Sequence, residues 1–386
     1  MQNRKPRVVR VVTASYVVPW HLGNTLKRIT KDFDVCVVGQ NVSIYAKDYP
    51  GVEWFDIDLN RKISIIADFS SLIKLIVFLR RYKPDIVHSI MPKAGLLAAL
   101  AGIIGFVPVR LHTFTGQVWV GNKSIFKWIF YVFDWLINKL NTVCLTDSPS
   151  QSKFLFDFGI SHYGKPLPVL GIGSLSGVDL SRFNADKMVD KKARLSETLH
   201  IKDEQFVFAF VARKTREKGA FDVLQAFSRL VKSYPDCLLL FVGPDESDGE
   251  LAALSLNDPA LFQQVISVGQ VDNHEAYLAI ADVLCLPSYR EGFGTIVIDA
   301  AAMAKPTIGS DIVGLVDSID NHKTGLLFPA GDVEALAEAM MSFLVNSEQL
   351  DAMGTAARNR AEKFFSADIL YDELKKLYFD LCKRSF

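Results

Sequence analysis

Several patterns that would assign this 386-residue sequence to a familiar class are missing from it. Its five cysteines are odd in number and widely spaced, and none belongs to a CxxC pair of the kind that marks a zinc or redox site. No apolar run reaches the roughly 18 to 20 residues that a membrane-spanning helix requires. No cluster of metal-ligating residues is apparent either, so we expect a protein with reduced thiols, no metal site and no cofactor.

Length and composition indicate a globular protein of two domains. A chain of 386 residues exceeds what one hydrophobic core usually supports, and 49% of it is apolar. The N-terminal segment opens with basic residues ahead of an apolar run, which superficially resembles a signal peptide. Because Arg10 interrupts that run, we interpret it as the first strand of the fold.

Net charge differs in sign between the two halves of the chain, because acidic residues are scarce in the first half. The first 183 residues contain 22 Lys and Arg against 12 Asp and Glu, whereas the remainder contains 21 against 31. This excess indicates that the first half meets an anionic partner, with nucleic acid and an anionic membrane surface as the two obvious candidates. Mutual attraction between the halves is the simpler alternative.

Short runs rich in Val and Ile alternate with helix-like segments throughout the chain. They occur at residues 7–12, 35–38, 86–89 and 143–146, and a second set begins after residue 200. This alternation is typical of parallel βαβ units, so we predict an α/β protein of two Rossmann-like domains with parallel sheets facing across a cleft. Residues 164–183, rich in Pro and Gly, predict the connection between them. The predicted domains are residues 1–180 and 181–365, with residues 366–386 packing back on the first.

Residues 281–306 predict a buried strand, a glycine-containing loop and a helix that opens near Gly294 or Thr295. Free amides at that helix end, together with Gly292 and Gly294, suit a phosphate or a sugar. Glu291 in the loop and Asp299 inside the helix can accept hydrogen bonds from paired hydroxyls of a sugar ring or a ribose. The alternative is a solvated loop acid and an ordinary helix acid.

A basic loop follows the strand that begins the second set. Arg213 and Lys218 bracket it ahead of Gly219. Two fixed cations suit a diphosphate leaving group, and the loop falls at the carboxyl end of a strand, where ligand sites are expected. A solvated basic loop is the alternative.

These segments resemble the retaining glycosyltransferases of family 4, or group 1, which have the GT-B fold. The resemblance spans most of residues 140–345 and includes LTDSPSQSKF, SGVDLSRF, LLFVGPD, VGQVDNHEAYLAIADVLCLPSYREGFG and NHKTGLLFPAGDVEALAEAM. It implies that Glu291 contacts hydroxyls of the donor sugar and that Asp299 holds the ribose, in place of the family's usual glutamate. Ala212 replaces the family's usual glycine before the arginine of the basic loop.

The same resemblance implies roles for further residues. Catalytic roles fall to Glu291, Arg213, Lys218 and His112, the last placed after a strand and beside the donor sugar. Donor-binding roles fall to Gly23, Gly243, Val271, Gly292, Phe293, Gly294, Thr295 and Asp299. Acceptor-binding roles fall to Thr113, Thr115 and Gln117 in the segment HTFTGQVW. Phe114 and Trp119 of that segment line an acceptor pocket or pack in the core.

HTFTGQVW also resembles the bacterial surface-polysaccharide subgroup, whose acceptors are sugars on polyprenyl diphosphate. The implied function is a metal-independent, retaining transfer of a hexose or N-acetylhexosamine from a nucleotide sugar, with UDP the most frequent base. The implied partners are a lipid-linked acceptor and an anionic membrane rather than nucleic acid, with the enzyme peripheral on the inner face of the cytoplasmic membrane. A nucleotide-sugar epimerase or phosphorylase of the same fold and a non-catalytic nucleotide-sugar-binding subunit remain as alternatives.

One aromatic segment leaves two interpretations open. Residues 124–140 combine six aromatic side chains with lysines at their ends, a mixture suited to a helix at a membrane interface. Aromatic residues lie nearly all around this helix, however, which equally predicts a buried one.

Overall fold

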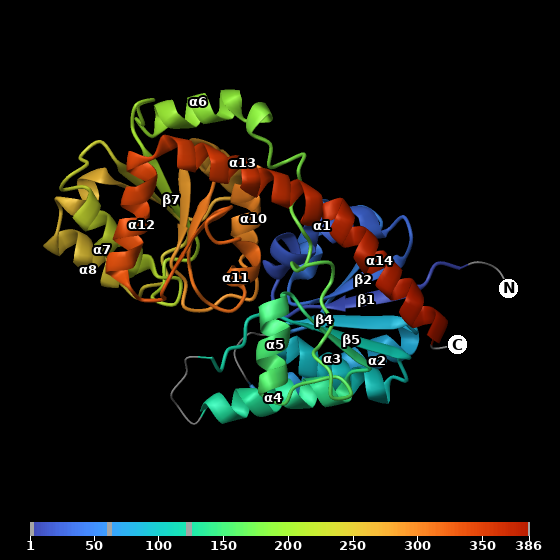
Figure 1. Cartoon of the computed structure of the whole chain (residues 1–386). Helices are drawn as coiled ribbons and strands as arrows, with labels where there is room; N and C mark the ends of the chain where they lie inside the picture. The colour runs from blue at the N-terminus through green and yellow to red at the C-terminus, as the bar shows by residue number, and fades with distance from the viewer. Residues whose placement is uncertain (1–3, 60–63, 121–125, 385–386) are drawn as a thin grey trace. The chain divides into compact units, whose positions relative to one another are not determined.

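The computed structural model describes residues 4–59, 64–120 and 126–384. Its contacts divide the chain into two units (Figure 1). Unit 1 comprises Met1–Gly177 and Ala367–Phe386, and unit 2 comprises Val178–Ser366. Each unit is built around one parallel sheet of six strands.

The sheet of unit 1 has the order β3-β2-β1-β4-β5-β6. Its strands are β1 (Arg7–Val11), β2 (Asp34–Gly39), β3 (Val52–Asp56), β4 (Ile86–Ile90), β5 (Val109–Phe114) and β6 (Val143–Thr146). The principal helices are α1 (Gly23–Ile29), α2 (Ile65–Tyr82), α3 (Pro92–Ile104), α4 (Phe126–Leu140), α5 (Pro149–Asp157) and α14 (Ala367–Arg384). Helices α1 and α14 share one buried cluster with the sheet, whereas α2 and α3 share the cluster on its other face.

The sheet of unit 2 repeats this topology as β12-β11-β10-β7-β8-β9. Its strands are β7 (Val207–Val211), β8 (Leu238–Val242), β9 (Val265–Val268), β10 (Val283–Leu286), β11 (Thr307–Ser310) and β12 (Gly325–Phe328). The helices are α6 (Val189–Thr198), α7 (Ala220–Leu230), α8 (Glu250–Asn257), α9 (His274–Ile280), α10 (Thr295–Ala302), α11 (Leu315–Ser318), α12 (Val333–Val345) and α13 (Ser347–Phe364). Both orders are those of a Rossmann fold, so the prediction of two Rossmann-like domains is confirmed. That the sheets face each other across a cleft stays a prediction.

A polar cluster inside unit 1 ties the last helix to the sheet. Arg10 is 3% exposed, and one of its guanidinium nitrogens donates to the hydroxyl of Tyr378 on α14 at 3.2 Å. The same hydroxyl lies 2.6 Å from Nδ1 of His88, whose Nε2 lies 2.8 Å from Oγ1 of Thr113. Burial lowers the pKa of His88 well below its ordinary value, and Arg10 adds to that effect. The residue that interrupts the first apolar run is therefore an internal anchor for the C-terminal helix.

Helix α4 covers residues 126–140 of the aromatic segment, and residues 124 and 125 lie outside the described residues. Its inner side buries Asp134, Ile137 and Asn138, while Trp128 and Trp135 are 64% and 39% exposed. The helix is therefore amphipathic, with aromatic side chains on the outside. Within the described parts of the chain, no helix is both long and apolar enough to span a bilayer.

Candidate functional site

The candidate site in unit 2 lies where the order of its sheet reverses. Strands β7 and β10 are neighbours at the centre of the sheet. After β7 the chain continues to β8 and β9 on one side of this pair, and after β10 it continues to β11 and β12 on the other side. In open α/β sheets, ligands bind outside the carboxyl ends of the strands at such a reversal. The loop after β7 carries Arg213 and Lys218, and the loop after β10 carries Glu291.

A short ion pair joins these two loops. Nζ of Lys218 lies 2.6 Å from Oε1 of Glu291, and the hydroxyl of Ser288 donates to the same oxygen at 2.8 Å. The side chains of Lys218 and Glu291 are 17% and 13% exposed, so both are largely withdrawn from solvent yet open to a ligand. The structure thus brings together two of the residues that the sequence predicts, 73 positions apart.

A second pair supports the first. The guanidinium group of Arg290 donates to both carboxylate oxygens of Glu217, at 2.9 and 2.8 Å, and the amide of Tyr289 donates to the carbonyl of Glu217 at 2.8 Å. Burial raises the pKa of Glu217, but Arg290, Lys218 and Arg213 together outweigh it and hold that pKa below its ordinary value. Glu217 therefore stays ionised, and its contacts with Tyr289 and Arg290 hold the loop after β7 against the loop after β10.

Gly219 allows the loops to approach this closely. It has φ +71°, and a Cβ atom at this position would lie 2.0 Å from the carbonyl oxygen of Pro287 in the other loop. No side chain fits there, because the neighbouring atom is backbone that cannot rotate away.

Replacing Gly219 with alanine is expected to destabilise unit 2 more than the same change at Gly249. Both glycines precede helices with positive φ, a conformation that costs an alanine about 1 to 2 kcal/mol. Gly249 has nothing within 4 Å of the added Cβ, whereas at Gly219 overpacking adds about 1 to 3 kcal/mol. Denaturant midpoints of Gly219→Ala and Gly249→Ala measure the difference, and equal losses would contradict the proposed backbone contact.

Arg213 is directed to a different set of carboxylates. It donates to Oε2 of Glu246 at 2.8 Å and lies 3.7 Å from Oε1 of Glu217, and its side chain is 25% exposed. No contact with Glu291 is recorded for it in the part of unit 2 that the structure describes. Arg213 is held at the same edge of the sheet with its charge accessible, and an anionic ligand would compete with Glu246 for it.

Helix α10 begins as the sequence predicts. It starts at Thr295 after Gly294, which has φ +79°, so the first amides of the helix and the positive end of its dipole lie beside the Glu291 loop. Gly292 is half-buried, whereas Gly294 is buried, and a Cβ on it would lie 2.6 Å from a methyl group of Leu315. Phe293 does not line the loop, because its ring is 3% exposed and lies 5.2 Å from the ring of Phe365. Phe293 belongs instead to a buried apolar cluster of unit 2.

Asp299 lies one turn inside α10 and has a partner that the sequence does not reveal. Its Oδ2 lies 3.3 Å from Nε2 of His274, the first residue of α9. The two side chains are 11% and 26% exposed. The pair presents a carboxylate acceptor and a ring nitrogen side by side.

The ends of β8 and β9 meet the basic loop closely. Gly243 has φ +137°, and a Cβ there would lie 1.9 Å from the carbonyl oxygen of Ala212, so only glycine fits. Lys214 is 4% exposed and donates to Oγ of Ser267 at 2.8 Å and to the carbonyl of Val268 at 2.9 Å. Burial lowers the pKa of this lysine. Val271 lies in the loop between β9 and α9 and is half-buried.

His112 does not lie where the sequence analysis places it. It is the fourth residue of β5 rather than a residue after the strand, and it is 1% exposed. Its Nδ1 lies 2.9 Å from Oγ of Ser89, and a Cβ on Gly95 of α3 would lie 2.5 Å from its ring. Burial lowers its pKa to about 3. The strand is buried on both faces, so no alternation in the sequence marks where it ends.

The other predicted residues of unit 1 differ in accessibility. Thr113 is buried against His88, and Gln117 is 3% exposed with its amide oxygen accepting from Gln151 at 3.2 Å. Thr115 is half-buried just beyond the carboxyl end of β5, the most accessible of the three predicted acceptor residues. Gly23 opens α1 in the interior, where a Cβ would lie 2.7 Å from the hydroxyl of Tyr49.

Phe114 and Trp119 belong to the core rather than to a pocket, since they are 2% and 1% exposed. The indole of Trp119 donates to Oδ2 of Asp134 at 2.8 Å, and burial raises the pKa of Asp134 to about 7. This contact fixes the segment after β5 against α4.

Sequence reasoning missed four polar residues at the unit 2 site, namely Ser288, Glu217, Arg290 and His274. Ser288, Arg290 and His274 lie within the quoted segment VGQVDNHEAYLAIADVLCLPSYREGFG, and Glu217 lies in the basic loop. The charge or hydroxyl group of Ser288, Glu217 and Arg290 was the available signal. The pairing of His274 with Asp299 had no local signal, because it depends on how α9 and α10 pack.

Family models match both units of the chain. The model described as Glycosyl transferases group 1 matches residues 191–360, and the one described as Glycosyl transferase 4-like matches residues 7–147. Capsular polysaccharide biosynthesis glycosyltransferase CapM of Staphylococcus aureus is 29% identical over 100% of this chain and 99% of its own length. The UDP-Gal:alpha-D-GlcNAc-diphosphoundecaprenol alpha-1,3-galactosyltransferase of Escherichia coli is 27% identical over 84% of this chain and 82% of its own.

Solved structures share the fold across nearly the whole chain. A glycosyltransferase from Rickettsia africae ESF-5 has a TM-score of 0.79 at 19% identity, covering 98% of this chain and 99% of its own. HepE of Anabaena, in complex with UDP and glucose, has a TM-score of 0.79 at 15% identity, covering 96% and 98%. At these identities the likeness shows the fold alone.

Proposed function

Because this chain is a glycosyltransferase of the group 1 type with the GT-B fold, we propose that it transfers a hexose or N-acetylhexosamine from a UDP-linked sugar to a sugar on polyprenyl diphosphate. The product would serve the assembly of a bacterial capsule, O-antigen or related glycan. The observation that carries this proposal is the Lys218–Glu291 pair at the sheet reversal, with Arg213 beside it. The name of the Escherichia coli relative supports the acceptor class, and that of the Staphylococcus aureus relative supports a role in capsular polysaccharide synthesis.

The charges of unit 2 suit departure of a nucleoside diphosphate. Negative charge develops on the leaving phosphate as the sugar bond breaks, and Arg213, Lys218 and the amides at Thr295 are the groups available to stabilise it. Glu291 would accept hydrogen bonds from the sugar, which requires its contact with Lys218 to loosen as donor enters. Asp299 and His274 would hold the ribose.

We propose that transfer proceeds with retention of the configuration of the donor sugar. The acceptor hydroxyl would attack on the face from which the diphosphate leaves, and its proton would pass to the leaving phosphate. Glu291 is already engaged by a lysine and a serine, which suits orientation of the sugar better than attack on it. The chemistry therefore depends on positioning and electrostatic stabilisation.

A radiolabelled UDP-sugar incubated with a polyprenyl diphosphate-linked sugar tests the activity. Label that moves to the lipid supports transfer, whereas label released as free sugar or retained on an isomerised nucleotide sugar would replace it with hydrolysis or epimerisation. A parallel thermal-shift series with UDP-, GDP- and ADP-sugars identifies the base, because a ligand that binds only the native state raises its stability.

The rate of sugar transfer is expected to be unchanged by EDTA. Among the described residues no group of three or more His, Cys, Asp or Glu side chains is placed to hold a metal ion. The Asp-x-Asp sequences at residues 32–34 and 56–58 lie in unit 1, where Asp32 is bonded to Lys375 and Tyr371 and Asp56 to Ser43. Initial rates with EDTA and with added Mn²⁺ or Mg²⁺ measure this, and strict dependence on either ion would contradict a metal-independent mechanism.

The same proposal places the enzyme on the inner face of the cytoplasmic membrane, with unit 1 in contact with anionic lipid. Helices α2, α3 and α4 pack side by side on unit 1. Large apolar residues are exposed on them or just after α3, including Phe69, Phe106 and Trp128 at 63%, 82% and 64% exposure. Each nearby Lys or Arg adds about 1 kcal/mol on an anionic bilayer. Co-sedimentation with vesicles across a salt series tests docking, and equal recovery on neutral and anionic vesicles at low salt would rule it out.

A further inference from the structure

Helix α2 has apolar side chains on both of its sides, although only one side faces the sheet. On the inner side of the helix, Leu75 and Leu79 are fully buried. On its outer side, Ile66, Ile73 and Val77 are 87%, 46% and 41% exposed. A helix at a water-exposed surface normally carries polar residues on its outer side. A contiguous apolar face of this kind marks a site of interaction.

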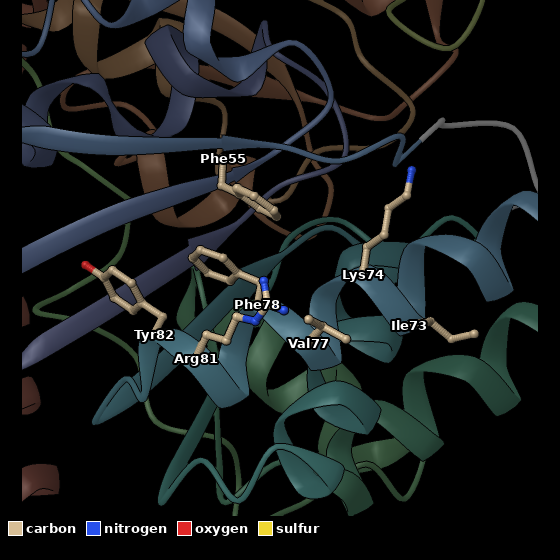
Figure 2. A pocket seen from close by; sticks show the side chains of 7 residues that line it. All are labelled: Phe55, Ile73, Lys74, Val77, Phe78, Arg81 and Tyr82. Carbon is tan, nitrogen blue, oxygen red and sulfur yellow. The ribbon is translucent and has the colours of Figure 1, made fainter.

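An open groove lies between this outer side and the edge strand β3 (Figure 2). Its volume is about 480 Å³, and its lining residues are Phe55, Ile73, Lys74, Val77, Phe78, Arg81 and Tyr82. The rings of Phe55 and Phe78 are stacked with centroids 4.4 Å apart, and Phe78 is stacked on Tyr82 at 5.3 Å. The three stacked rings therefore form one continuous apolar wall. We call the whole cavity, with the seven lining residues named above, the α2 groove.

Two cations flank the α2 groove. Lys74 and Arg81 are both exposed and stand seven residues apart on α2, hence on one side of the helix and about 10 Å apart along it. In the described parts of unit 1, neither has a carboxylate within 4 Å. The single acid of α2, Asp68, is paired with Lys93, and Glu53 on β3 accepts from the hydroxyl of Tyr82.

An apolar channel flanked by cations matches an amphiphile with an anionic head. A second copy of this chain fits less well, because a two-fold contact through this face would set Lys74 and Arg81 against their equivalents. A single peptide would leave the neighbouring exposed side chains of α3 and α4 uncovered, among them Ile103, Ile104 and Trp135. A bilayer covers them all, and tryptophan is enriched at its interface.

We propose that the α2 groove holds one acyl chain of an anionic phospholipid while Lys74 and Arg81 bind its phosphate. This inference rests on the membrane docking in the proposed function and specifies where a lipid is seated. Helix α2 follows β3, so its first turns, with Ile66 and Phe69, lie toward the carboxyl edge of the sheet. The groove itself is lined by later turns of α2, from Ile73 to Tyr82, so a lipid there would anchor unit 1 along the outer side of this helix.

The test uses a single introduced cysteine as a reporter. All five native cysteines are buried, so Val77→Cys in the full chain can be labelled with a polarity-sensitive dye, and Val345→Cys on unit 2, a residue 66% exposed, is the matched control. With phosphatidylglycerol–phosphatidylcholine vesicles, we expect a blue shift from the dye at position 77 and none at position 345. No shift at position 77 while the protein pellets with the vesicles would overturn the groove assignment and leave docking intact.

Charge and shape variants complete the test. Val77→Glu should weaken binding to anionic vesicles at least tenfold, while Val345→Glu should not. Lys74→Glu with Arg81→Glu should abolish the preference for anionic over neutral vesicles, whereas Lys191→Glu with Lys232→Glu, an equal change of net charge on exposed sites of unit 2, should preserve it. Wild-type affinity in both groove variants would overturn the proposal, as would self-association that Val77→Glu disrupts. Absence of vesicle binding by the wild-type chain would remove the docking and the groove together, with label transfer in detergent unaffected.

Discussion

Glu291→Ala and Glu291→Gln are each expected to lower kcat/KM for sugar transfer by about 10² to 10³ while leaving the fold intact. The carboxylate is 13% exposed at a loop tip and belongs to none of the buried apolar clusters, so its loss affects the site and not the core. Glutamine keeps the size of the side chain and a hydrogen bond with Ser288 but removes the charge that faces Lys218. The two variants therefore separate the need for charge from the need for volume.

The measurements are initial rates of label transfer and thermal unfolding of each variant. Glu250→Gln is the matched control, because Glu250 is also a carboxylate of unit 2 paired with an arginine, Arg216, but lies at an exposed helix start. Wild-type rates in both Glu291 variants would contradict the assignment of the donor site. A large loss in Glu250→Gln would show that the effect is not specific to the sheet reversal.

Arg213→Ala and Lys218→Ala are each expected to reduce kcat/KM by about 10², because each removes one of two fixed cations from the leaving diphosphate. The structure supplies the control within the same loop. Arg216 lies between them in sequence, but its side chain is 71% exposed and paired with Glu250 away from Glu291. Arg216→Ala should therefore transfer sugar at nearly the wild-type rate.

A binding measurement connects this loss to phosphate. Calorimetric titration with UDP and with uridine should show that Arg213→Ala and Lys218→Ala lose affinity for UDP while uridine binding changes little. Lys218→Ala also leaves Glu291 without its ion-pair partner, so the double variant Lys218→Ala with Glu291→Gln should cost less than the two single losses combined. Near-wild-type kinetics in both single variants would move the phosphate site elsewhere.

Part of the candidate site could be predicted because its signals are local. Gly294 followed by Thr295 marks a helix start independently of the tertiary structure. A glycine with positive φ and the free amides that follow it depend on only a few consecutive residues. The alternation of short apolar runs and helices predicted the Rossmann-like units for the same reason. His112 was misplaced because a strand buried on both faces gives no local sign of its end.

The sequence by itself determined the two α/β units, the loops that carry Arg213, Lys218 and Glu291, and the surplus of positive charge in the first half. Tertiary structure alone decided which of these groups meet. The Lys218–Glu291 pair exists because the sheet order places β7 beside β10, and Gly219 lets their loops touch. Likewise, His274 reaches Asp299 only through the packing of α9 and α10, and the α2 groove forms only because β3 is an edge strand. Partners distant in sequence are selected by strand order and helix packing, which no short stretch of residues encodes.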